Sequence, residues 1–163
     1  MKILSVDPGL ADAAATGFHG QEIVEHWSWT TQSSGPRPSF SNVVCRAQYM
    51  ADQFRAAVES FHPDQVAIEG YGDFGGGVKR TVSLRWTTPL VVGCLSMVLR
   101  DHPDIKVFYQ PPEVVLPAYA QARGMWKARK FGLIVPGDER LTNEHLRSAG
   151  AHGLYALAMA GRR

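Results

Sequence analysis

Strand-like and helical patterns follow one another along this chain in an order that few folds accommodate. Short apolar runs typical of buried strands cover residues 3–6, 15–19, 22–31, 65–69 and 105–109. Apolar residues at helical spacing cover residues 43–61, 89–99 and about 143–160. Because three strands come first and helices alternate with strands afterwards, the order predicts an α/β fold with a five-stranded mixed sheet flanked by helices.

Turn and cap residues stand at the ends of several of these elements. The proline and glycine of Asp7-Pro8-Gly9 end the first strand, and His19-Gly20 supplies a hairpin turn between the second and the third. The expected helix caps are Ser41 or Asn42, Thr88 before a first-turn Pro89, and Asn143.

The composition is that of an ordinary globular domain. With 163 residues, 45% hydrophobic and 20% charged, the chain is expected to form one domain, residues 1–163. The formal charge of +2 neither demands nor excludes nucleic acid as a partner. Cys45 and Cys94 lie in apolar runs and are expected to be buried thiols. No signal peptide is visible and the longest apolar stretch, 90–99, is too short to span a membrane, so a cytoplasmic location is expected.

Two acidic residues, Asp7 and Glu69, end strongly apolar runs. Neighbouring strand ends build the sites of open α/β sheets, so the two carboxylates are expected to lie together. Two carboxylates side by side need a proton or a cation between them, and a divalent metal ion meets that need with oxygen ligands. The competing interpretation is that each acid only forms the turn at the end of its strand.

The last helix offers a third contribution to the same site. Glu144, His145, Ser148 and His152 fall within one sector roughly 100° wide, beside an apolar face. The two histidines are about 10 Å apart along the helix axis, so they cannot share one metal ion. His152, which lies deeper in the helix, is the stronger candidate ligand, although a lone helix histidine can also be a packed or solvent-facing residue.

Several segments together resemble the RuvC family of Holliday junction resolvases, particularly its phage-type members. The resembling segments are I-L-S-V-D-P-G at 3–9, T-G at 16–17, A-I-E at 67–69, the Pro112–Val115 stretch with Gly124 and Lys127, and A-H-G-L-Y-A-L-A at 151–158. The resemblance implies an RNase H-like fold, a homodimer, and cleavage of four-way junctions with two Mg²⁺ or Mn²⁺ ions held by four side chains. For a phage-encoded member the location would be the host cytoplasm.

Carried over to this chain, the resemblance makes Asp7, Glu69 and His152 catalytic metal ligands. Many members carry an aspartate three residues before the last ligand, where this chain has Ala149. Glu144 is the candidate for the fourth ligand and catalytic residue, unless it only favours the positive end of its helix. His145, Ser148, which is the nearest oxygen, or no fourth ligand at all are the alternatives.

The implied reaction is phosphodiester hydrolysis. One ion would activate a water molecule and the other would stabilise the leaving 3′ oxygen. Asp7 is expected to bridge the ions, Glu69 to hold the leaving-group side, and His152 to hold the nucleophile side or act as a general base.

Two basic clusters and two aromatic residues are expected to contact branched DNA. The resemblance favours stacking of a loop aromatic on opened bases. The predicted DNA-binding residues are Tyr71, Phe74, Lys79, Arg80, Arg85, Arg123, Lys127, Arg129 and Lys130. Solvated surface is the alternative for the basic clusters.

Three other functions compete with junction resolution. The chain could be an RNase H or flap-type nuclease of the same fold, or half of an actin-like ATPase, although 163 residues supply only one of the two domains that an ATPase needs. It could also be a non-catalytic junction-binding protein, an interpretation motivated by the alanine at position 149.

Overall fold

A computed structural model describes residues 1–31, 40–70, 84–110 and 140–160 of the chain. Its centre is one five-stranded sheet in the order β3-β2-β1-β4-β5. The strands are β1 (Lys2–Asp7), β2 (Asp12–His19), β3 (Glu22–Thr30), β4 (Gln65–Glu69) and β5 (Lys106–Gln110). β1, β4 and β5 run parallel, while β2 is antiparallel to β1 and β3. The predicted mixed sheet is therefore confirmed.

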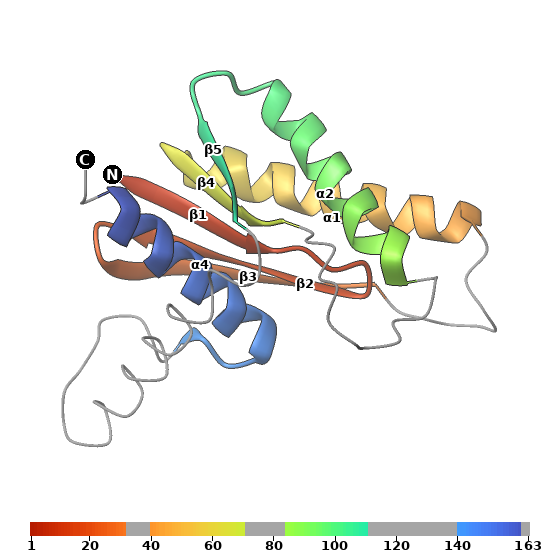
Figure 1. The fold of residues 1–163 in the computed structure, drawn as a ribbon, viewed down its shortest axis with the longest axis horizontal. Coiled ribbons are helices and arrows are strands. Elements are labelled where there is room, and N and C mark those ends of the chain that lie inside the picture. The colour runs from red at the N-terminus through yellow and green to blue at the C-terminus, as the bar shows by residue number, and fades with distance from the viewer. Residues whose placement is uncertain (32–39, 71–83, 111–139, 161–163) are drawn as a thin grey trace.

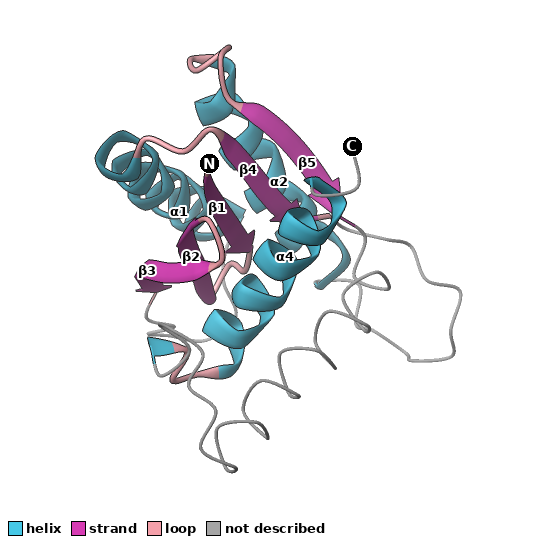
Figure 2. Cartoon of the chain, turned by 90° about the vertical axis from the view of Figure 1, so that its left-hand side faces the viewer, coloured by secondary structure: helices cyan, strands magenta, loops and turns pink. Residues whose placement is uncertain are grey.

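Helices cover both faces of this sheet. α1 (Phe40–Phe61) and α2 (Leu84–Arg100) pack against each other on one face, and α4 (Glu144–Ala160) crosses the other face (Figures 1 and 2). No helix in the described ranges is long and apolar enough to cross a membrane.

The alternation of side chains along the strands divides the interior into two cores. In β1, Leu4 and Val6 join the larger core beneath α1 and α2, whereas Ile3 joins the smaller core beneath α4. Because successive strand residues point to opposite faces, Asp7 emerges on the same side as Ile3. The strand pattern therefore directs this carboxylate toward α4 and away from the main core.

Helix α4 lies very close to the sheet because a glycine faces it. Gly153 stands over the fully buried Phe18 of β2, and a Cβ atom on Gly153 would come within 2.1 Å of the Phe18 ring. Asn143 caps the helix as predicted, since its Oδ1 accepts a hydrogen bond from the Leu146 backbone N–H at 2.8 Å. Both contacts fix the position of the helix over the sheet.

The other two helices begin earlier than the sequence indicated. α1 begins at Phe40, so Ser41 and Asn42 lie within its first turn and do not precede it. α2 begins at Leu84, so Pro89 lies inside the helix. A proline this near the helix start removes one backbone hydrogen bond, and the helix continues because apolar residues beyond it remain packed.

The predicted burial of the cysteines is wrong for Cys45, which is exposed, and only partly right for Cys94, which is half-buried. The buried arc of α1 includes Ala47, Met50 and Phe54, and Cys45 lies outside this arc although its neighbours in sequence are apolar.

Candidate metal centre

Three polar side chains form a row across the carboxyl ends of the parallel strands. Glu69 on β4 is paired with Gln110 on β5. Val6 on β1 is paired with Ile68 on β4, so the next residue, Asp7, follows beside Glu69. Residues paired across neighbouring strands share a face, and Asp7, Glu69 and Gln110 therefore all face α4. We call these three residues the sheet row.

A second row of polar side chains faces the first from α4. His145, Ser148 and His152 are spaced by three and four residues, which places them on one side of a helix. The helix is anchored nearby, because the Thr16 hydroxyl of β2 donates to the Leu146 carbonyl at 3.4 Å. We call His145, Ser148 and His152 the helix row.

The two rows meet through four contacts. His145 Nδ1 lies 3.0 Å from Asp7 Oδ2. The Ser148 hydroxyl donates to Glu69 Oε2 at 3.3 Å, and His152 Nε2 lies 3.3 Å from the same oxygen. At the far end, His152 Nδ1 lies 2.8 Å from Gln110 Oε1. Each carboxylate of the sheet row thus has a histidine of the helix row beside it.

The two carboxyl groups do not ionise independently. Burial raises the pKa of Asp7, and the negative charge of Glu69 raises it further, against the opposing effect of His145. Burial also acts to raise the pKa of Glu69, but the hydrogen bond and positive charge of a protonated His152, together with contacts from Asp7 and Ser148, outweigh it and hold the pKa below its usual value. Hydrogen bonding between the two carboxyls contributes to both shifts, raising the pKa of Asp7 and lowering that of Glu69.

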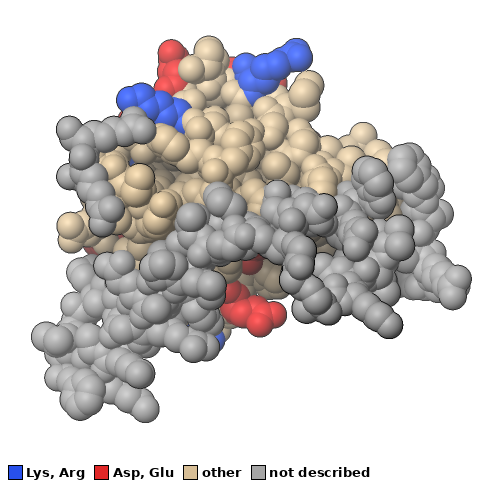
Figure 3. Space-filling view, in the orientation of Figure 1, with Lys and Arg blue, Asp and Glu red and all other residues tan. Residues whose placement is uncertain are grey.

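The environment of His145 is strongly negative. Its hydrogen bond to Asp7 raises the pKa of its imidazole, and the charges of Asp7, Asp12 and Glu144 act in the same direction, against partial burial. Figure 3 shows acidic side chains reaching the surface on the side of the molecule that carries α4. This concentration of negative charge favours a bound cation.

The chemistry of the donor set fits divalent metal ions. Carboxylate oxygens and imidazole nitrogens are ligands for Mg²⁺ and Mn²⁺ in such sites. His152 Nε2 is buried, forms no hydrogen bond and is directed at Glu69, as expected of an unused ligand atom. Within the described ranges no three His, Cys, Asp or Glu side chains converge on one point, so each ion would be held by two of them and complete its shell with water or phosphate oxygens.

Of the four predicted ligands, Glu69 lies beside both Asp7 and His152, although the three side chains do not converge on one point. Glu144 is exposed in the first turn of α4, and among the described residues no hydrogen bond or ion pair joins it to the sheet row. His145, one of the alternatives for the fourth ligand, lies beside Asp7 instead. Ala149, which replaces the aspartate of many family members, is fully buried in the packing of α4.

Gln110 is the member of the site that the sequence interpretation missed. A signal existed, because Gln110 directly follows an apolar strand in the same way as Asp7 and Glu69 do. Its amide carries no charge, so it does not stand out beside the two carboxylates at the strand ends.

Most of the predicted DNA-binding residues lie outside the described part of the chain. Arg85 belongs to α2, but its side chain is not described. The remaining eight lie outside the described residues: Tyr71, Phe74, Lys79, Arg80, Arg123, Lys127, Arg129 and Lys130.

Comparisons with known proteins bear on the fold. No protein-family model and no curated protein matches the chain in sequence. Among solved structures, Thermus thermophilus RuvC in complex with a Holliday junction substrate is similar, with a TM-score of 0.72, 17% identity, and coverage of 99% of this chain and 96% of RuvC. Another Thermus thermophilus RuvC structure has a TM-score of 0.69 and 18% identity over 99% of this chain and 97% of RuvC.

The yeast mitochondrial Holliday junction resolvase Ydc2 is similar as well, with a TM-score of 0.63 and 13% identity over 95% of this chain and 75% of Ydc2. These likenesses confirm that the chain has the RNase H-like fold of RuvC, as its sequence motifs indicated.

Proposed function

We propose that this chain, which shares the fold of RuvC, is a divalent-metal-dependent endonuclease that hydrolyses phosphodiester bonds in branched DNA, with the four-way junction as its main substrate. The observation that carries the proposal is the contact of the sheet row with the helix row. It combines two neighbouring carboxyl groups, of which Asp7 has a pKa raised by burial and by the charge of Glu69, with a buried imidazole nitrogen that lacks a hydrogen bond. A bound cation would balance the negative charge of the carboxylates and would give the imidazole nitrogen a partner.

Four side chains would hold the metal ions, and two Mg²⁺ or Mn²⁺ ions are expected. Asp7 and His145 form one pair of donors, and Glu69 and His152 form the other. When bound, such ions lower the pKa of water and neutralise the charge of the scissile phosphate. A bound cation would favour the ionised form of Asp7, so both carboxylates would act as anionic ligands.

The remaining members of the two rows orient the ligands. Ser148 donates a hydrogen bond to Glu69 and restricts the rotation of its carboxylate. His152 has no exposed surface, so it is poorly placed to exchange protons with bulk water. This burial favours a ligand role for His152 over the general-base role that its sequence position also allowed.

The choice of substrate rests on the fold and on symmetry. Thermus thermophilus RuvC has been captured with a Holliday junction, and it is similar to this chain over nearly all of both chains. A four-way junction needs two symmetric cuts, which a two-fold symmetric homodimer can supply with one site per subunit. α2 offers an apolar surface for such a dimer, since Met97 is 57% exposed and the adjacent Tyr109 of β5 is 52% exposed.

Cleavage of matched DNA substrates tests the proposal. Wild-type protein would be incubated with Mg²⁺ or Mn²⁺ and end-labelled DNA: a four-way junction, a fork, a linear duplex and an RNA–DNA hybrid of the same sequence. Symmetric nicking of the junction, lost when EDTA is added, is the expected result. Faster cutting of the fork or the hybrid would show that one of these is the preferred substrate, and the proposed metal centre would stand. Tight junction binding without cleavage in either metal would contradict the enzymatic function and favour a binding protein.

A further inference from the structure

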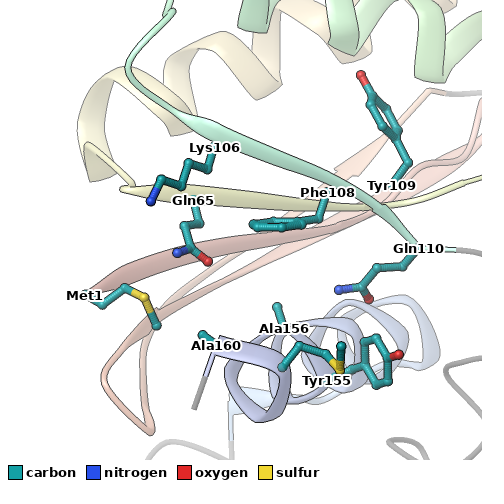
Figure 4. Close-up of a pocket in the computed structure, with 10 residues that line it drawn as sticks. Met1, Gln65, Lys106, Phe108, Tyr109, Gln110, Tyr155, Ala156 and Ala160 are labelled. Carbon is teal, nitrogen blue, oxygen red and sulfur yellow. The ribbon is translucent and has the colours of Figure 1, made fainter. Parts of the chain in front are cut away.

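Gln110 and His152 form a closed pair at the end of the candidate site. His152 Nδ1 lies 2.8 Å from Gln110 Oε1, and both residues are buried, with 0% of His152 and 5% of Gln110 exposed. Figure 4 shows the Gln110 side chain extending from β5 toward α4, at one end of a cavity of about 400 Å³ between the two elements. Neither residue can readily replace this contact with a hydrogen bond to bulk water.

The chemistry of the pair determines which nitrogen of the imidazole carries hydrogen. In the structure the Gln110 amide turns its oxygen toward His152 Nδ1, and because an amide oxygen only accepts hydrogen bonds, Nδ1 donates in this arrangement. A neutral imidazole has one N–H group, and its other nitrogen then presents a lone pair. That nitrogen is Nε2, which lies 3.3 Å from Glu69 Oε2 and forms no hydrogen bond. Two electron-rich atoms thus lie side by side, and both can bind the same cation.

The alternative tautomer would close the site. If Nε2 carried the hydrogen, it could donate to Glu69 Oε2, and neither atom would be available to a metal ion without breaking that bond. The position of Gln110 opposes this outcome, because the other tautomer would place the Nδ1 lone pair against the Gln110 oxygen. Backbone pairing holds the main chain of Gln110 in place, since the Gly70 N–H donates to its carbonyl at 2.8 Å and Glu69 is its partner in the β4–β5 register. The side-chain amide has its oxygen toward His152 Nδ1.

We propose that Gln110 is a positioning residue that selects the Nδ1–H tautomer of His152 and thereby keeps Nε2 available as a metal ligand. The inference rests on the proposed function for the identity of the cation, but the tautomer itself is a property of the metal-free chain. Groups that orient a ligating histidine are worth about 10–100-fold in metal affinity when they are removed.

Two variants and one control test this role. Gln110→Met removes the acceptor with little change in volume, whereas Gln110→Glu keeps an oxygen acceptor at the same place. Gln65→Met is the matched control, because Gln65 lies on β4 and lines the same cavity but makes no contact with His152 among those the structure describes. Thermal unfolding of each protein would show that the variants are folded before they are compared.

The first measurement is the tautomer of His152 in the metal-free protein, by ¹⁵N NMR of the imidazole at pH 8, with the signal assigned from a His152→Gln protein. The second is the affinity for Mn²⁺, by electron paramagnetic resonance. Wild type, Gln110→Glu and Gln65→Met should show hydrogen on Nδ1 only. Gln110→Met should shift hydrogen to Nε2 and bind Mn²⁺ about 10–100-fold more weakly than wild type.

Hydrogen on Nε2 in the wild-type protein would overturn the proposal. So would a Gln110→Met protein that keeps its Mn²⁺ affinity, or one that loses affinity without a change of tautomer, since the latter effect would be structural. If the tautomers behave as expected but wild type binds no Mn²⁺, the role of Gln110 in selecting the tautomer stands and the metal centre of the proposed function fails.

Discussion

Gly153 sets the distance between α4 and the sheet, so Gly153→Ala should move the helix that carries the candidate ligands. An alanine Cβ at this position would lie 2.1, 2.7 and 2.8 Å from three carbons of the Phe18 ring. Phe18 has no exposed surface and is packed in the smaller core, so its ring cannot swing aside into solvent. Either the ring or the helix must shift.

The cost follows from two opposing effects. Overpacking of a buried contact destabilises a fold by about 1–3 kcal/mol. Replacing a helical glycine by alanine stabilises it by up to about 1 kcal/mol through helix propensity. Because three ring carbons would lie closer than van der Waals contact, the overpacking cost should fall in the upper part of its range. Subtracting the gain in helix propensity leaves a net destabilisation of about 1–2 kcal/mol. A chain of this size should then unfold about 2–8 °C lower.

Gly93→Ala is the matched control for this experiment. Gly93 lies within α2, and a Cβ atom there would meet no atom within 4 Å. This substitution should raise the unfolding temperature, by up to about 4 °C. Phe18→Leu combined with Gly153→Ala should recover part of the lost stability, because the smaller side chain makes room for the new methyl group.

The assay is thermal unfolding of the four metal-free proteins, followed by Mn²⁺ affinity of those that fold. Gly153→Ala should also weaken Mn²⁺ binding, because the preceding residue, His152, is displaced from Glu69 and Gln110. An unfolding temperature of Gly153→Ala equal to or above that of Gly93→Ala would refute the close-packing argument.

Four further predictions follow from the site. Burial raises the folded-state pKa of Asp7, so its proton stabilises the fold at pH values below the unfolded-state pKa, and this stabilisation is lost as the pH rises through the folded-state pKa. Asp7→Asn should therefore raise the unfolding temperature of the metal-free protein by about 2–4 °C at pH 8. Near pH 3 the substitution should leave the unfolding temperature almost unchanged, as measured by calorimetry. The pKa of His145 is raised, mainly by its hydrogen bond to Asp7, and its imidazole must be neutral to bind a metal ion. Mn²⁺ affinity should therefore rise with pH by up to about tenfold per pH unit, and an affinity that does not vary between pH 6 and 8 would contradict a ligand role for His145. His145→Gln should weaken Mn²⁺ binding more than Glu144→Gln, because of these two residues His145 is the one that contacts Asp7 in the described structure. The reverse order of Mn²⁺ affinities in titrations would show that Glu144 is the fourth ligand. Asn143→Ala should cost about 1 kcal/mol of unfolding free energy through loss of the helix cap, and an unchanged denaturant midpoint would show that the cap hydrogen bond contributes nothing.

The sequence predicted the sheet because its strands carry strong local signals. Each run of buried residues in β1 and β4 ends at an acid, and these ends coincide with the observed ends of the strands at Asp7 and Glu69. The start of α2 was less predictable, because a proline that usually begins a helix lies within it. Such a helix is held by packing, and packing is not visible in local propensity.

The site was only partly predictable for a related reason. Helical spacing placed His145, Ser148 and His152 in one sector, but it could not determine which of them meets which strand. That assignment depends on the approach of α4 to the sheet, set by Gly153 and Phe18, and on the pairing of Glu69 with Gln110 across β4 and β5. Both are contacts between residues far apart in sequence.

Nicking of a four-way junction by Asp7→Asn protein in Mn²⁺ tests the central claim most directly, because this change removes one carboxylate charge from the middle of the candidate metal centre. The control is Glu25→Gln, an equivalent loss of one carboxylate on the exposed surface of β3. We predict that Asp7→Asn binds the junction but nicks it at least about 100-fold more slowly than wild type. This decrease in rate would exceed the effect of about 10–100-fold that is expected when a residue only orients a metal ligand. Glu25→Gln should nick at the wild-type rate. Nicking by Asp7→Asn at the wild-type rate would show that the Asp7–Glu69 pair is not the catalytic metal centre.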